Sequence, residues 1–316
     1  MTKNPSFKKN LFILSCIMLA VFGIVTAGYS QEEKQIDRSQ AVFQQINNFK
    51  KATVFLGEIT EKNGKTEINF IGTGTLLYIQ DIFHLVTAKH IVENIKPGTD
   101  IKFFLNTKAG GIKYISINEI RKKLNIDWVF HENKLVDIAM IPVLLNPAED
   151  DFTFILESDF ESTQNIFELS DLFYLSFQPG IFSPKRINPI IREGMVSIIN
   201  DDKTFYIDGF AFPGNSGSPC FLKFSPLFYD KNGPGFFTPD TNTGFKFLGI
   251  IGESLTSIDV AVSAQTGRQR VTFEDNTGLS KVWPTDFIRE IINSSSFKKQ
   301  IEKCKDIIKK QGAQKK

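Results

Sequence analysis

The sequence predicts an all-β protein, because short runs of strand-forming residues recur along most of its length. The runs KATVFLGEI, TEINFIGTGTLLYI and DIFHLVTA are rich in Val, Ile, Phe, Thr and Tyr, and turn formers such as NGK separate them. Similar runs follow at DIKFFL, KYISI, DIAMIPV, LFYLSF, IIREGMVSII, TFYIDGFAF and FKFLGIIG. They do not alternate with long helices, so antiparallel strands in a sandwich or barrel are expected rather than a parallel sheet.

Chain length and net charge limit the number of domains and the classes of partner to be expected. A chain of 316 residues is long enough for one large domain or two small ones, and its formal net charge is only +2. Removing Lys3, Lys8 and Lys9 from the 37 basic residues leaves 34 against 35 acidic residues. A body this close to neutral lacks the basic surface that binds nucleic acid, so no nucleic-acid partner is expected.

The N-terminus has the pattern of a targeting segment. Lys3, Lys8 and Lys9 precede an apolar stretch from Leu11 to about Ala27, and a polar run follows it. Residues 1–30 are therefore interpreted as a signal peptide or signal anchor, and the protein is expected to be exported to the periplasm or secreted. An uncleaved anchor at residues 11–27 would be its one association with a membrane, and lipidation at Cys16 is a further alternative.

The rest of the chain divides by composition. Residues 31–50 suit a short lead helix or a flexible arm. Residues 51–150 are interpreted as a first β half. Residues 151–296 are interpreted as a second β half with a helix after Trp283. Within them, Pro147 to about Gln164 is acidic and irregular and suits a link between the halves, while residues 225–244 suggest a long surface loop.

The end of the chain, residues 297–316, is a basic amphipathic tail. Phe297, Ile301, Cys304 and Ile308 share one face of a predicted helix, and such a face more often packs on the body of a protein than on a membrane. Cys304 and Cys220 are the two thiols outside the targeting segment, so a disulfide scaffold is excluded. One bridge between them remains possible, but a buried Cys220 and a semi-exposed Cys304 is the preferred interpretation.

The sharpest local signal is the heptapeptide PGNSGSP, residues 213–219. Its central Ser216 is flanked by glycines between two strand-like runs, where a sharply turned backbone would present the hydroxyl oxygen and direct amide N–H groups inward. Serine is a weak nucleophile at neutral pH, so it needs an adjacent base, and that base needs an acceptor to orient it.

His90 and Asp137 are the candidates for that base and that acceptor. His90 lies in LVTAKHIVENI at the end of a strand, and Asp137 lies in the otherwise apolar LVDIAMIPV. A buried carboxylate is costly unless it is paired, so Asp137 requires a partner such as the His90 imidazole. The alternatives are weaker: Asp208 and Asp127 lack the apolar setting, and His84 and His131 are interpreted as structural residues.

Together these three segments resemble the trypsin-like (chymotrypsin-fold) serine peptidases, most closely the bacterial branch that includes the Deg/HtrA proteases. The residues that match the family's three motifs, in the family's own order, are Thr87, Ala88 and His90; Asp137, Ile138 and Ala139; and Gly214, Asn215, Ser216, Gly217 and Pro219. The resemblance covers roughly Thr53 to Ile292, and no PDZ domain follows it.

The resemblance implies two six-stranded antiparallel β-barrels and a C-terminal helix, with the triad between the barrels. His90 and Asp137 would come from the first barrel and Ser216 from the second. The hydroxyl of Ser216 would attack the scissile carbonyl of a polypeptide substrate while His90 takes its proton. The backbone N–H groups of Gly214 and Ser216 would form the oxyanion hole.

The resemblance also suggests which residues contact the substrate. Phe210 falls at the floor of the primary specificity pocket. Cleavage after Lys or Arg is therefore not expected, and a substrate with an apolar residue at the cut site is expected instead. Gly249 and Gly252 belong to the strand that would pair with the substrate backbone. Next to them, Glu253 is interpreted as a solvated edge charge, with a side chain that reaches the pocket as the alternative. Asn215 replaces an aspartate of the digestive members, which argues against activation by N-terminal cleavage.

No cofactor or metal is expected, because histidine and cysteine are too scarce to form an obvious ligand set. Two other functions remain open on the same residues. One is a catalytically inactive binding module on this fold, and the other is an esterase, although the chain lacks a GxSxG elbow between a strand and a helix. The sequence does not predict an oligomeric state.

Overall fold

The structure is a computed structural model that describes residues 40–62, 64–93, 98–178, 186–223, 227–230, 233–236 and 244–313. The chain divides into two compact units, Met1–Asn47 and Asn48–Lys316. The protein is mostly β, with 46% strand and 24% helix, as the sequence predicts. The targeting segment predicted for residues 1–30, with its apolar stretch 11–27, lies outside the described residues. No helix in the described ranges is long and apolar enough to span a membrane.

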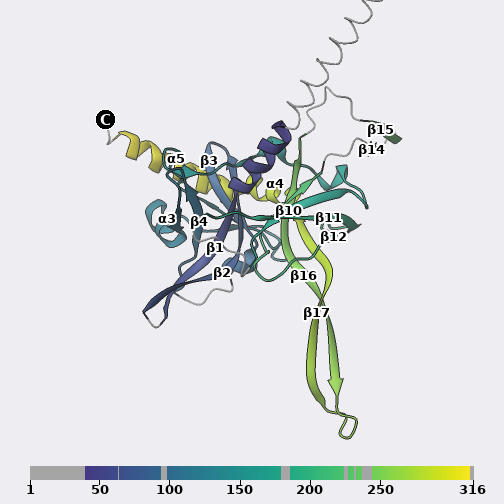
Figure 1. The fold of residues 1–316 in the computed structure, drawn as a ribbon. Helices are drawn as coiled ribbons and strands as arrows, with labels where there is room; N and C mark the ends of the chain where they lie inside the picture. The colour runs from purple at the N-terminus through teal and green to yellow at the C-terminus, as the bar shows by residue number, and fades with distance from the viewer. Residues whose placement is uncertain are drawn as a thin grey trace, which may run out of the picture. The chain divides into compact units, whose positions relative to one another are not determined.

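The first half of the larger unit forms one nine-stranded sheet (Figure 1). Its strands are β1 (Thr53–Lys62), β2 (Lys65–Ile79), β3 (Ile82–Thr87), β4 (Lys102–Thr107), β5 (Ile112–Ser116), β6 (Val129–Phe130), β7 (Ala139–Pro142), β8 (Asp150–Asp151) and β9 (Ile155–Leu156). The order is β5-β4-β1-β2-β3-β7-β6, with β8 beside β4 and β9 beside β2. The sequence predicts a six-stranded barrel here, whereas the structure has a larger sheet. Seven strands form its main path, and short segments of the predicted link add β8 and β9.

The second half contains a closed six-stranded antiparallel barrel, as expected. Its strands are β10 (Asp171–Ser176), β11 (Ile190–Ile199), β12 (Phe205–Asp208), β13 (Pro219–Leu222), β16 (Lys246–Val262) and β17 (Gln269–Pro284). They close in the order β10-β11-β12-β17-β16-β13. The segment predicted as a surface loop, residues 225–244, contains the small hairpin of β14 (Leu227–Asp230) and β15 (Gly233–Phe236), so the loop interpretation is corrected there.

Short helices connect and cover the sheets. They are α2 (Lys89–Glu93), α3 (Ile117–Leu124), the 3-10 turns η1 (Glu157–Asp159) and η2 (Thr163–Asn165), α4 (Thr285–Asn293) and α5 (Ser295–Ala313), and residues 40–52 are also helical. α5 contains most of the predicted amphipathic tail. Phe297, Ile301 and Cys304 are buried, while Ile308 is exposed. Cys220 and Cys304 are both buried and free, so the predicted alternative of a bridge between them is wrong. Cys304 is also buried where the sequence predicts a semi-exposed thiol.

The sheet and the barrel share a hydrophobic core. One cluster of buried residues runs from the first sheet into β13 and β16 of the barrel, and a second fills the barrel interior. Phe221 of β13 belongs to the shared cluster and stacks on Phe49, with ring centroids 4.0 Å apart. Because apolar side chains of both halves are removed from water together, the two halves stabilise each other.

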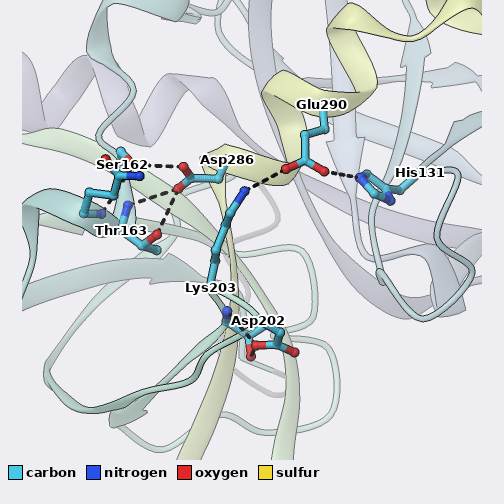
Figure 2. A network of polar contacts seen from close by, with 9 residues as sticks. His131, Ser162, Thr163, Asp202, Lys203, Asp286 and Glu290 are labelled. Atoms are coloured by element: carbon cyan, nitrogen blue, oxygen red, sulfur yellow. Dashed lines mark hydrogen bonds and ion pairs between the residues drawn. The ribbon is translucent and has the colours of Figure 1, made fainter.

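Helix α4 adds polar contacts between the same two halves (Figure 2). The carboxylate of Glu290 accepts from His131, which follows β6 of the sheet, and from Lys203 in the turn between β11 and β12, both at 2.9 Å. Asp286, in the first turn of α4, accepts from the hydroxyl of Ser162 and the amide of Thr163. Pro284 is the N-cap residue of this helix, and Thr285 and Asp286 are its first two residues.

Strands β16 and β17 continue beyond the barrel as a two-stranded ribbon (Figure 1). We call residues 253–262 of β16 and 269–278 of β17 the ribbon. Within the ribbon, the register runs from Thr256, opposite Asn276, to Val262, opposite Gln269. The sequence pattern predicts β16 only as far as the run FKFLGIIG, so the ribbon is a new feature of the structure.

Candidate active site

His90 and Asp137 lie together, as the sequence predicts. His90 is the second residue of α2, which begins directly after β3, and Asp137 lies just before β7. The antiparallel pairing of Thr87 in β3 with Ala139 in β7 brings the two segments side by side. The imidazole Nδ1–H of His90 donates to Asp137 Oδ2 at 2.7 Å, and the backbone N–H of His90 donates to Oδ1 at 2.8 Å. Both carboxylate oxygens therefore hold the histidine.

The environment of His90 favours its protonated form. The hydrogen bond to Asp137 raises the pKa of His90 above its ordinary value of 6.5, against the opposing effect of burial. The negative charges of Asp137 and Glu253 raise it further. The side chain of His90 is 42% exposed, so solvent can reach the imidazole and exchange protons with it.

Ser216 lies in the loop between β12 and β13, residues 209–218, which we call the nucleophile loop. Strand β2 of the sheet holds this loop of the barrel. The amide of Thr73 donates to Ser216 O at 2.9 Å, the hydroxyl of Thr73 to Gly214 O at 3.0 Å, and the hydroxyl of Thr75 to Gly217 O at 3.3 Å. Sequence reasoning missed both threonines, because nothing local marks them as partners of a loop about 140 residues away.

The glycines on both sides of Ser216 are required by close packing and by backbone conformation. Gly214 and Gly217 have φ of 97° and 83°, which residues with a side chain rarely adopt. A Cβ on Gly217 would lie 2.0 Å from Thr73 O, and one on Gly214 would lie 2.0 Å from the ring of Phe70. The pattern of the motif therefore follows from how tightly the loop sits against β2.

Other contacts tie all three segments to the boundary between the sheet and the barrel. The Ile91 side chain, next to His90, packs so closely on Gly72 of β2 that a Cβ there would lie 2.3 Å from it. The amide of Gly217 donates to Ile251 O at 2.7 Å, and a Cβ on the next residue, Gly252, would lie 3.4 Å from Asp137 Oδ2. Among the described residues, no hydrogen bond joins the Ser216 hydroxyl to His90.

Backbone amides of the nucleophile loop fall into two groups. Those of Asn215, Gly217 and Ser218 donate to backbone carbonyls, whereas those of Gly214 and Ser216 donate no hydrogen bond within the described part of the chain. The buried side chain of Asn215 fixes the loop, because its Oδ1 accepts from the Phe212 amide at 3.0 Å and its Nδ2 donates to Phe177 O at 2.8 Å. The sequence predicts Asn215 only as a replaced aspartate and misses this role.

The predicted substrate-binding residues lie in different places. Phe210 is 51% exposed and lines a cavity of about 490 Å³, together with charged residues that include Arg192, Asp208 and Lys223. Gly249 lies in the barrel wall, where a Cβ would lie 2.1 Å from Trp283 O. Gly252 lies beside Asp137, as described above. Charged residues around Phe210 make this cavity more polar than the apolar pocket that the sequence suggests.

The remaining candidates from the sequence have other partners. Asp127 pairs with Arg121 at 2.8 Å, and Asp208 is exposed at the cavity next to Phe210. His84 is completely buried, which lowers its pKa to about 4. In the ranges that the structure describes, no group of three or more His, Cys, Asp or Glu is placed to hold a metal ion.

Comparisons with known proteins found no match for this chain. No protein-family model matches the chain, and no curated protein matches its sequence.

Proposed function

We propose that this chain is a serine endopeptidase that hydrolyses peptide bonds through Ser216, His90 and Asp137. The observation that carries the proposal is the double hydrogen bond from His90 to Asp137, at 2.7 and 2.8 Å. Structural ion pairs seldom need to fix both the backbone and the ring of a half-exposed histidine, whereas a general base must be held in one tautomer and one orientation.

The loop geometry supports the same function. Ser216 lies on a loop that Thr73 of β2 holds by hydrogen bonds. Gly72, the residue before Thr73, packs on Ile91, which is the neighbour of His90. The uncommitted amides of Gly214 and Ser216 supply the two donors that a tetrahedral oxyanion requires. We also propose that the sheet of the first half and the barrel of the second correspond to the two barrels of the trypsin-like fold, and that the protein acts after export.

The proposed reaction follows from these positions. Ser216 Oγ attacks the carbonyl carbon of the scissile bond while His90 Nε2 takes the hydroxyl proton, and Asp137 stabilises the resulting imidazolium. His90 then returns the proton to the leaving amine, which leaves an acyl group on Ser216. Water, deprotonated by His90 in turn, attacks this ester and releases the second product. In the described residues the Ser216 hydroxyl makes no hydrogen bond to His90. This is compatible with the scheme, because catalytic hydrogen bonds often shorten only when substrate is bound.

A fluorophosphonate probe tests the nucleophile. We expect the folded chain to form an adduct at Ser216 and to cleave peptide libraries, and we expect Ser216→Ala and His90→Ala to abolish both. Ser218→Ala is the matched control, because the Ser218 hydroxyl is buried without a partner among the described residues. Folded wild-type protein that forms no adduct would instead indicate a binding module, and hydrolysis of esters without hydrolysis of peptides would indicate an esterase.

The charge of Glu253 gives a prediction for the pH profile. Glu253 raises the pKa of His90, and the base must be neutral to act, so activity rises with pH through the pKa of His90. Replacing Glu253 by Gln removes a charge that favours the imidazolium. We therefore expect the acidic limb of kcat/KM to move to lower pH, as measured on a peptide substrate. Glu302→Gln, an exposed change on α5, is the control, and an unmoved limb in Glu253→Gln would refute the coupling.

A further inference from the structure

The outer edge of β17 in the ribbon has no partner strand in the described part of the chain. Strand β12 pairs with β17 only from Leu279 to Val282, and the residues after β12 still bond Gly278 and Asn276. Residues 269–275 are therefore paired on one side only, with β16. Figure 1 shows this part of the hairpin standing away from the barrel. A free edge presents a row of backbone N–H and C=O groups that another strand can pair with.

The ribbon also exposes apolar side chains on both faces. Ile258, Val260 and Val262 are exposed on β16, and Val271 and Phe273 are exposed on β17. The register places Phe273 opposite Asp259 and Ile258 opposite Glu274, so the apolar side chains of the two strands lie on opposite faces. An exposed ribbon with this composition is typical of an interaction surface rather than of a solvated loop.

The sequence of β17 in this region, QRVTFED at residues 269–275, is complementary to itself about its centre. When two copies of this strand pair antiparallel about Thr272, Arg270 lies directly opposite Glu274 of the partner subunit, and Val271 opposite Phe273 of the partner subunit. A two-fold axis makes each pair twice. One face of the joined sheet then gains two ion pairs, and the other gains two apolar pairs.

We propose that the protein forms a symmetric dimer through the edges of β17, with this register. The ordinary antiparallel pairing of strands supplies the backbone hydrogen bonds, and the charges select the register. The edge of β16 is a poorer candidate, because Asp259 is its one charged residue between Ser257 and Val262 and meets no basic residue in a two-fold pairing. The polar tip, SAQTGR at residues 263–268, argues against insertion into a membrane.

Charge reversal tests the dimer and its register in one experiment. The association of the purified full chain is measured by sedimentation equilibrium for wild type, Arg270→Glu, Glu274→Arg and the double variant. Each single reversal replaces two attractive pairs by two repulsive ones, so we expect the dissociation constant to rise about tenfold or more. The double variant restores opposite charges and should dimerise like wild type. An equimolar mixture of the two single variants should form a heterodimer.

Controls separate this register from general surface effects. Asp259→Arg changes the net charge of the ribbon as much as Glu274→Arg but lies on β16, so it should leave the dissociation constant unchanged. A wild-type protein that stays monomeric would overturn the proposal, as would a dimer insensitive to the single reversals or single variants that fail to pair with each other. Monomeric protein that floats with anionic vesicles would assign the ribbon to a membrane instead. None of these measurements depends on peptidase activity.

Discussion

Replacing Asp137 by Asn is expected to reduce turnover about 10⁴-fold while leaving the fold intact. The backbone N–H of His90 already donates to Asp137 Oδ1, and an amide oxygen can keep that bond. The amide nitrogen would then face His90 Nδ1, where the carboxylate now accepts, and would donate a hydrogen to it. His90 would carry its own proton on Nε2 and could no longer take one from Ser216.

The measurement is kcat on the best peptide from a library, with the fluorophosphonate labelling rate as a second readout. Asp127→Asn is the matched control, because Asp127 is a rival acid by sequence but pairs with Arg121 on the surface. Its turnover should stay close to that of wild type. If Asp137→Asn loses little turnover, or if Asp127→Asn loses as much, the assignment of the orienting acid is wrong.

Acid is expected to destabilise the folded protein through His84. Its Nδ1–H donates to Ile82 O at 3.0 Å, its ring stacks on Phe297 of α5, and its Nε2 is buried without a partner among the described residues. Burial lowers the pKa of His84 from 6.5 to about 4 in the folded state, so the unfolded chain binds more protons between these values. Above pH 6.5 His84 is neutral in both the folded and the unfolded state, so its titration does not lower the free energy of unfolding. As the pH falls to 4, His84 lowers that free energy by about 3 kcal/mol.

The comparison that isolates this effect is with His84→Phe, which keeps an aromatic ring on Phe297 and cannot titrate. Urea unfolding at several pH values between 7.5 and 4 gives the free energy of unfolding of both proteins. Carboxylates contribute equally to both curves. As the pH falls over this range, the free energy of unfolding of the variant should therefore rise by about 3 kcal/mol relative to that of wild type. His84→Leu should show the same relative gain. Parallel curves would mean that the imidazole is not held neutral.

The sequence predicts well the parts of the site that local chemistry marks. An aspartate inside an apolar run needs a partner, and its pairing with His90 follows from that cost. Glycines next to Ser216 reflect a backbone that only glycine tolerates. By contrast, the hydrogen bonds from Thr73 to the nucleophile loop join residues more than 140 positions apart. No local pattern marks such a contact.

The fold also has parts that the sequence predicts and parts that it does not. The six strands of the barrel include several predicted runs, because strands with a buried face carry a clear apolar pattern. The ribbon is missed because residues 253–278 mix charged and apolar residues on two exposed faces, which gives no hydrophobic period to read. The nine-stranded sheet differs from a six-stranded barrel partly through two-residue strands such as β8 and β9, which are too short to have a pattern.

The position of α4 has a consequence for the order in which the protein matures. Glu290 contacts both His131 and Lys203, and these contacts form only after residue 290 has been synthesised. By then His90, Asp137 and Ser216 have long left the ribosome. A nascent chain would therefore carry these three residues outside the ribosome before Glu290 can join His131 of the first half to Lys203 of the second.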